Sequence, residues 1–146
     1  MRRAYHFPGF TVLVPGQIRR EVEVVPKILP QGIPEGIPEI TENFTLIRAI
    51  ANLALFRSDD LENGNFDDPV QQFDPPIELR INYRMADMGH TNGDFNRLKL
   101  AYWDLEKWVV ISDDPHDYQI FPPSTGQIAE AKIGSWADDP TIAWGK

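Results

Sequence analysis

The amino-acid sequence predicts an all-β fold, an antiparallel β-sandwich of about eight or nine strands with one Pro-rich extended arm. Apolar and polar residues alternate along several short runs, most clearly over 77–83. Turn-forming residues separate these runs at roughly 8–15-residue intervals. The 146 residues include 13 Pro and 10 Gly, yet the hydrophobic fraction of 42% is enough for a folded core. This length suits one domain, so we assign 1–146 to a single sandwich, with 26–40 as the extended arm.

The first strands precede the arm. Residues 10–14 form a short apolar run closed by Pro15-Gly16, and 19–25 places Val22 and Val24 on one face. Proline then recurs at 26, 30, 34 and 38, a spacing that excludes both a helix interior and a central strand. We expect an extended, polyproline-like edge segment whose isoleucines pin it to the body.

Residues 44–57 allow two interpretations. A stripe of apolar residues with three Ala fits a helix, whereas alternation at both ends of the segment fits a strand. We favour the strand because the neighbouring segments have strand patterns. A polar loop rich in Asp, Asn, Gly and Pro follows over 58–76.

The C-terminal half has the clearest strand pattern. Residues 77–83 alternate strictly, and 97–102 with 108–110 predict a hairpin around a short turn. Further strands are expected at 118–121, 128–133 and 141–144. With no Cys for disulfides, the two sheets must be held together by packing, and the side chains expected between them are Leu79, Ile81, Leu100 and Trp108.

Charge and motif content exclude several functions. Lys and Arg number 14 against 22 Asp and Glu, a net charge of −8, which argues against binding nucleic acid or anionic lipid. The sequence has no apolar run of membrane-spanning length and no visible secretory signal. An intracellular protein and the mature part of an exported one both remain open. Because nucleophile-elbow, phosphate-loop and zinc-protease motifs are missing, we predict that the protein is not an enzyme.

Two acidic loops could hold a metal ion. Residues 113–117 contain three Asp and His116, and a solvated turn is the simpler interpretation of this loop. The other loop surrounds Gly64 and offers hard oxygen ligands for Ca²⁺, although its spacing is not that of an EF-hand. A solvated acidic turn is again the alternative. The candidate Ca²⁺ ligands in this loop are Asp59, Asp60, Glu62, Asp67 and Asp68.

The order of motifs along the chain resembles the ZU5-like β-sandwich modules of bacterial multidomain proteins. It runs from a Phe-x-Pro-Pro loop through Ile-Glu-Leu-Arg-Ile-Asn-Tyr (77–83) and Leu-Lys-Leu-Ala-Tyr-Trp-Asp (98–104) to Ala-Lys-Ile (131–133). Val-Leu-Val-Pro-Gly (12–16) is similar to the entry strand of those modules, so the resemblance covers roughly residues 9–146. It implies a sandwich fold and a role in interaction or assembly. Some relatives cleave themselves at His-Phe-Ser, but Ser135 here has neither that His nor that Phe beside it and lacks a means of activation.

The expected function is therefore that of a non-catalytic structural module that docks a partner protein or a neighbouring domain. Unpaired sheet edges offer main-chain pairing as the mode, and a homo-oligomer is one form that such docking could take. Four Trp also suggest an alternative, in which exposed indoles stack on a carbohydrate or an acidic loop binds Ca²⁺. The residues expected to contact a partner are Ile33, Ile37, Trp136 and Trp144.

Overall fold

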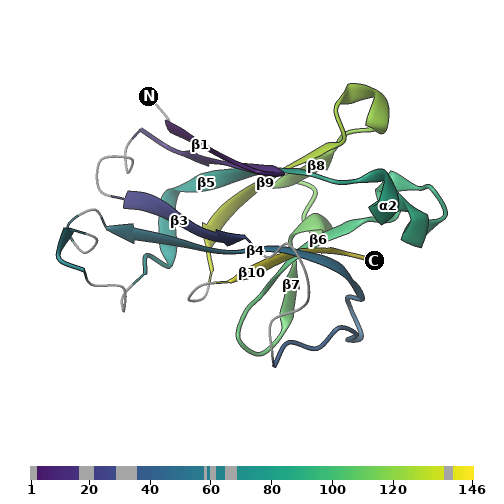
Figure 1. Cartoon of the computed structure of the whole chain (residues 1–146), viewed down its shortest axis with the longest axis horizontal. Coiled ribbons are helices and arrows are strands. Elements are labelled where there is room, and N and C mark those ends of the chain that lie inside the picture. Colours follow the sequence, from purple (N-terminus) through teal and green to yellow (C-terminus); the bar gives the residue numbers. More distant parts are fainter. Residues whose placement is uncertain are drawn as a thin grey trace.

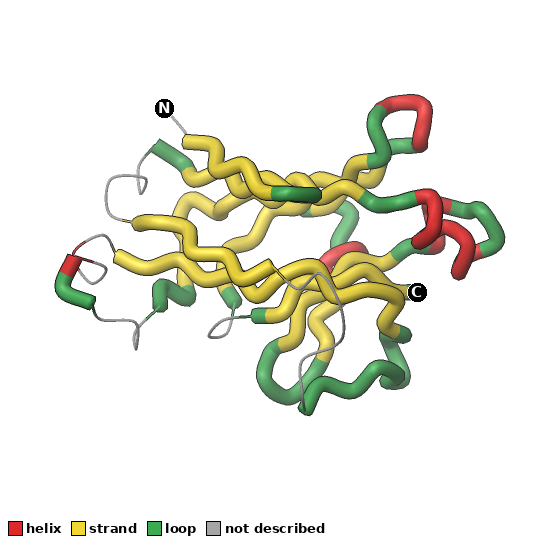
Figure 2. Tube along the Cα trace, in the orientation of Figure 1, coloured by secondary structure: helices red, strands yellow, loops and turns green. Residues whose placement is uncertain are grey.

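Two antiparallel β-sheets packed face to face make up the protein, as the predicted sandwich requires (Figures 1 and 2). The computed structural model describes residues 3–16, 22–28, 36–57, 59, 62–64, 69–136 and 140–146. Within these residues each sheet has five strands. The β5 sheet has the order β1 (Arg3–Phe7), β2 (Phe10–Val14), β5 (Gln72–Asn82), β9 (Ile128–Ser135) and β8 (Tyr118–Ile120). The β4 sheet has the order β3 (Val22–Ile28), β4 (Leu46–Arg57), β10 (Thr141–Gly145), β6 (Lys99–Trp103) and β7 (Trp108–Val110).

Helical structure is confined to short connections. Among the described residues these are α2 (Met85–Met88), four 3₁₀ turns, η1 (Gly89–Thr91), η2 (Phe95–Arg97), η3 (Ile111–Asp113) and η4 (Pro123–Thr125), and the helical residues Asp59 and Glu62. The α2–η2 region links β5 to β6 and lies at one end of the sandwich (Figure 1). Among the described segments, no helix is long and apolar enough to cross a membrane.

The main core lies between the sheets. Val12, Leu79 and Ile81 contribute to it from the β5 sheet, and Leu53 and Leu100 from the β4 sheet. Leu79 and Ile81 come from β5, in which alternate residues are buried, and this is the pattern that a half-buried strand requires. The predicted packing of Leu79, Ile81 and Leu100 is therefore confirmed.

The tryptophan that spans the two sheets is Trp144, on β10. Its side chain is fully buried at 0% exposure, and its Nε1–H donates to the carbonyl oxygen of Asn82, on β5, at 3.0 Å. The Tyr83 ring meets it edge-on at a centroid distance of 6.0 Å. Trp136 is also buried in this core, against Phe73. The expectation that these two indoles are exposed contact residues is therefore wrong, because both are part of the core.

Trp108 is buried at 2% exposure, but it does not lie between the sheets as predicted. It belongs to a second cluster with Phe44, Ala101 and Ala143. Alternate residues of β6 point to opposite faces, and Trp103 pairs with Trp108 in the register of β6 and β7. Trp108 and Ala101 therefore lie on the outer face of the β4 sheet, opposite to Leu100.

The ambiguous segment 44–57 contains a long strand, β4, that pairs with both β3 and β10. The strand interpretation is thus confirmed. Residues 26–28, expected in the extended arm, form the end of β3 instead, and Pro26 pairs with Leu53 at the edge of the β4 sheet. An edge strand tolerates Pro because one side of it makes no ladder bonds. Residues 29–35, with Ile33, lie outside the described part of the chain, so the arm as such is not shown.

Candidate interaction surfaces

Residues 36–45, here called the strap, cross the outer face of the β4 sheet and cover Trp108. The indole Nε1–H of Trp108 donates to the carbonyl oxygen of Pro38 at 3.0 Å. The Asn43 side-chain amide donates to the Trp108 carbonyl oxygen at 3.1 Å, and the Phe44 ring lies 4.7 Å from the indole between centroids. The strap thus satisfies the indole N–H and the backbone carbonyl of Trp108, and it covers a second hydrophobic cluster on this face.

The far end of the strap pairs with the C-terminus. Thr45 and Lys146 exchange both of their backbone hydrogen bonds, each 2.9 Å long. Gly145 sits directly under the strap, where a Cβ atom would lie 2.5 Å from Phe44 Cε1 and from the Thr45 carbonyl oxygen. Only glycine allows the strap to approach β10 this closely.

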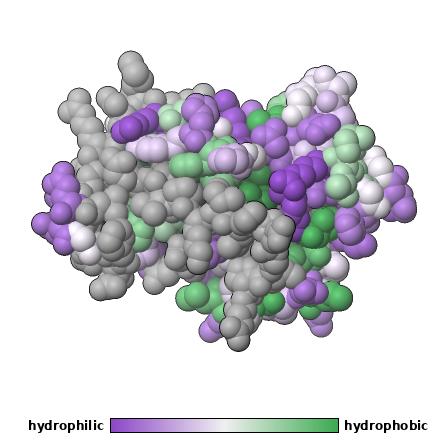
Figure 3. Space-filling model, viewed as in Figure 1, coloured by the Kyte–Doolittle hydropathy of each residue, from purple (hydrophilic) through white to green (hydrophobic). Residues whose placement is uncertain are grey.

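Apolar side chains remain on the surface around Trp108. Ile40 of the strap is 73% exposed, and Leu105, in the turn between β6 and β7, is 66% exposed. Ile37 and Trp103 are partly buried against the Trp108 cluster. We call these four residues the Trp108 face. Figure 3 shows hydrophobic side chains at the lower margin of the molecule, where the strap and the β6–β7 turn lie in Figure 1.

Leu105 has a second unusual property. Its φ angle is 54°, in the left-handed region that leucine seldom adopts. A leucine in this conformation, with its side chain exposed, is unfavourable both for the backbone and for solvation. Exposed carboxylates flank the face, namely Glu39, Glu42 and Glu106.

The predicted contact residues are thus divided by the structure. Ile37 lies on the Trp108 face, partly buried against the Trp108 cluster. Trp136 and Trp144 are interior, and Ile33 is outside the described residues. The expectation that Ile40 pins the arm to the body is wrong, because this side chain is 73% exposed, and sequence analysis missed Leu105 as a surface group. The signal available for Leu105 was a single large apolar residue inside the polar turn Asp-Leu-Glu-Lys.

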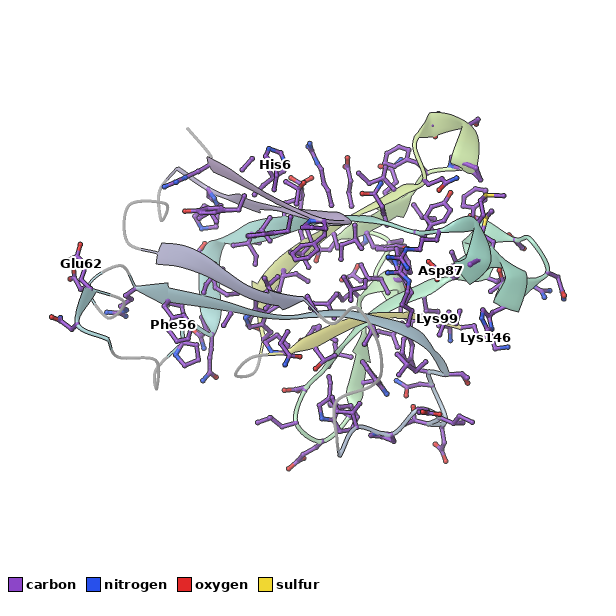
Figure 4. All side chains as sticks on the ribbon, in the orientation of Figure 1. His6, Phe56, Glu62, Asp87, Lys99 and Lys146 are labelled. Carbon is purple, nitrogen blue, oxygen red and sulfur yellow. The ribbon has the colours of Figure 1, made fainter. Side chains whose placement is uncertain are left out.

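The predicted Ca²⁺ loop is described only in part. Asp59 and Glu62 are exposed at the end of the sandwich opposite α2, where Figure 4 labels Glu62. The other three candidate ligands, Asp60, Asp67 and Asp68, lie outside the described residues. Across the part of the chain that is described, no three His, Asp or Glu side chains are grouped so that they could hold a metal ion.

A charged cleft of about 350 Å³ opens on the outer face of the β5 sheet, beside β8 and β9. Glu130, Lys132 and His116 line it, together with Glu78 and Asp117. Ion pairs cross the neighbouring face, where Arg80 Nε lies 3.6 Å from a Glu78 oxygen and 3.5 Å from a Glu130 oxygen. The carboxylates and cations on this face offset one another, which is typical of a solvated sheet face.

One buried ion pair fixes the α2 end of the sandwich. Arg48, on β4, donates from Nε and Nη2 to the two carboxylate oxygens of Asp87, at 3.1 and 2.8 Å. The backbone N–H of Arg84 also donates to Asp87, at 2.8 Å. The Asp87 side chain is only 3% exposed. Figure 4 labels Asp87 beside α2. The pair therefore ties the β4 sheet to the segment that leaves the β5 sheet.

Comparisons with known proteins identify no relative. No protein-family model, no curated protein and no solved structure matches this chain.

Proposed function

We propose that the protein is a non-catalytic β-sandwich module that binds another protein, or a neighbouring domain, through the Trp108 face. The observation that carries the proposal is that two exposed apolar side chains, Ile40 and Leu105, belong to the strap and to the β6–β7 turn, the two segments that adjoin the buried Trp108 cluster. Exposed apolar groups on a rigid support, rimmed by polar residues, are typical of protein interfaces.

Rigidity supports the proposal because a preformed surface loses little conformational entropy on binding. The strap is fixed by the two hydrogen bonds to Trp108 and by its pairing with Lys146. The flanking carboxylates of Glu39, Glu42 and Glu106 define the partner further. Because Lys107 follows Glu106 in the same turn and Lys99 donates to the Asn43 carbonyl oxygen of the strap, the partner's contact surface should be apolar at the centre with both signs of charge at the rim.

The test is co-purification from native extract with immobilised protein. A double variant, Ile40→Asp with Leu105→Asp, places charges on the Trp108 face without touching its buried residues. Met85→Asp is the matched control, because Met85 is 61% exposed and lies on α2, away from this face. We expect a protein that wild type and the control retain and the double variant loses. A set of retained proteins that is the same for all three variants would contradict the proposal.

A further inference from the structure

The two sheets have four edges, and they differ in how open they are. Strands β7 and β8 have only three residues each, and β3 has Pro26 within it. Short strands and proline both make an edge a poor template for another strand. The fourth edge, β1, has five residues and no proline. It is therefore the edge best suited to pairing.

The register shows which backbone groups of β1 point outward. Phe7 pairs with Phe10 across the Pro8-Gly9 turn, and Tyr5 pairs with Val12. In an antiparallel ladder, residues that bond to one neighbour alternate with residues that face away from it. The N–H and C=O groups of Ala4 and His6 therefore point away from β2, and no described residue supplies a partner to these four groups.

We propose that β1 pairs antiparallel with β1 of a second copy of this chain, centred on Tyr5, so that the two β5 sheets become one continuous sheet. In this register Ala4 lies opposite His6 of the second copy, and His6 lies opposite Ala4 of the second copy. The two-fold axis relates these two pairs to each other. All four outward groups of each copy then find a partner. This self-complementarity about Tyr5 is what a two-fold symmetric interface requires.

The side chains of β1 are compatible with this register. Tyr5 and Phe7 are partly buried against the inter-sheet core, and the Arg3 guanidinium carbon already lies 4.8 Å from the Tyr5 ring centroid. Pairing would place Arg3 beside Phe7 of the second copy on the same face, where a cation–π contact forms.

Charge also favours a second copy at this edge. The chain carries a net charge of −8, but β1 has no carboxylate and is exposed at Arg3. The two Arg3 residues would lie four residues apart along the ladder, about 14 Å, which is beyond the screening length of about 8 Å at physiological salt. The acidic surfaces of the two copies therefore meet at their least acidic edge.

The first measurement uses the unaltered protein. Sedimentation velocity over a concentration series should show a monomer–dimer equilibrium. Ala4→Pro removes an outward N–H from each copy but no β1–β2 bond, so we expect the dimer to weaken at least about tenfold. Ala4→Thr retains the N–H and should dimerise like wild type. Equal unfolding midpoints of the two variants would show that the fold is retained.

A single-cysteine experiment tests the register, because the chain has no Cys of its own. Tyr5 faces itself across the proposed two-fold axis, so Tyr5→Cys should give a disulfide-linked dimer under mild oxidation. His6→Cys places the two sulfur atoms about two residues apart along the ladder, roughly 7 Å, and should not.

The inference is overturned if wild type remains a monomer at about 1 mM, or if the dimer forms but Ala4→Pro leaves it intact. It is also overturned if the two Cys variants cross-link equally. An acidic peptide that binds the edge of a monomeric chain would instead assign β1 to a different protein. The proposed function does not depend on these outcomes, since the Asp variants of the Trp108 face should dimerise normally.

Discussion

The buried ion pair between Arg48 and Asp87 gives the sharpest prediction for stability. Asp87→Ala removes three hydrogen bonds and leaves the Arg48 guanidinium without its counter-ion. Breaking a buried pair costs about 3–5 kcal/mol, but Arg48 is 22% exposed and can recover some hydration. We therefore expect a loss of about 2–4 kcal/mol in the free energy of unfolding.

The reverse substitution should cost more. Arg48→Met leaves the Asp87 carboxylate, 3% exposed, with the Arg84 backbone N–H as its one remaining donor among the described residues. An unpaired charge destabilises the fold more when it is more deeply buried, because less water reaches it. The double variant, Arg48→Met with Asp87→Ala, strands neither charge and should be more stable than Arg48→Met alone.

Urea unfolding followed by tryptophan fluorescence measures all four proteins of this double-mutant cycle. A coupling energy above about 1 kcal/mol, unchanged by added salt, is the expected result. A coupling energy near zero, or a cost of Asp87→Ala below about 0.5 kcal/mol, would refute the reasoning because it would mean that the pair is solvated.

Further predictions follow from individual contacts. Gly145→Ala should lower the free energy of unfolding by about 2–3 kcal/mol, because the added Cβ meets the Phe44 ring and the Thr45 carbonyl oxygen. The control Gly134→Ala, whose added Cβ meets no atom, should change the free energy of unfolding by less than about 0.5 kcal/mol. Leu105→Asn should stabilise the fold by about 0.5–1 kcal/mol, because asparagine tolerates the left-handed conformation, while weakening capture of the partner. Burial raises the pKa of Tyr118 above its ordinary value of 10.0, so the free energy of unfolding should fall as pH rises above 10. In Tyr118→Phe this fall should be less steep, which unfolding measured from pH 8 to 11 would show. Millimolar Ca²⁺ should leave the thermal midpoint of the protein unchanged, and a rise of several degrees in calorimetry would restore the acidic loop as a metal site.

The strands could be predicted from the sequence where one face is buried and the other is exposed to solvent. Residues 77–83 alternate because β5 faces the core on one side and solvent on the other. The same rule fails for β4, where consecutive residues are buried, as in Leu53–Phe56, so that alternation gives no signal. Strand β1 was missed, although Tyr5 and Phe7 alternate with Ala4 and His6 just before a Pro-Gly turn.

The position of Trp108 could not be read from alternation. Both faces of β6 carry apolar residues, with Leu100 on one and Ala101 on the other, so parity did not reveal which face a tryptophan would occupy. The strap decides this, and its contact with Trp108 joins residues that are 70 positions apart. Exposed side chains such as Leu105 carry no periodic signal at all, which is why the surface was found only in the folded chain.

Photo-cross-linking from the Trp108 face tests the central claim most directly. The photoreactive residue p-benzoylphenylalanine would replace Leu105 in one variant and Met85 in another, and each would be irradiated in native extract. If the Trp108 face binds a partner, position 105 gives a covalent adduct to one partner protein and position 85 gives none to that protein. No adduct from position 105, or the same adducts from both positions, would contradict it.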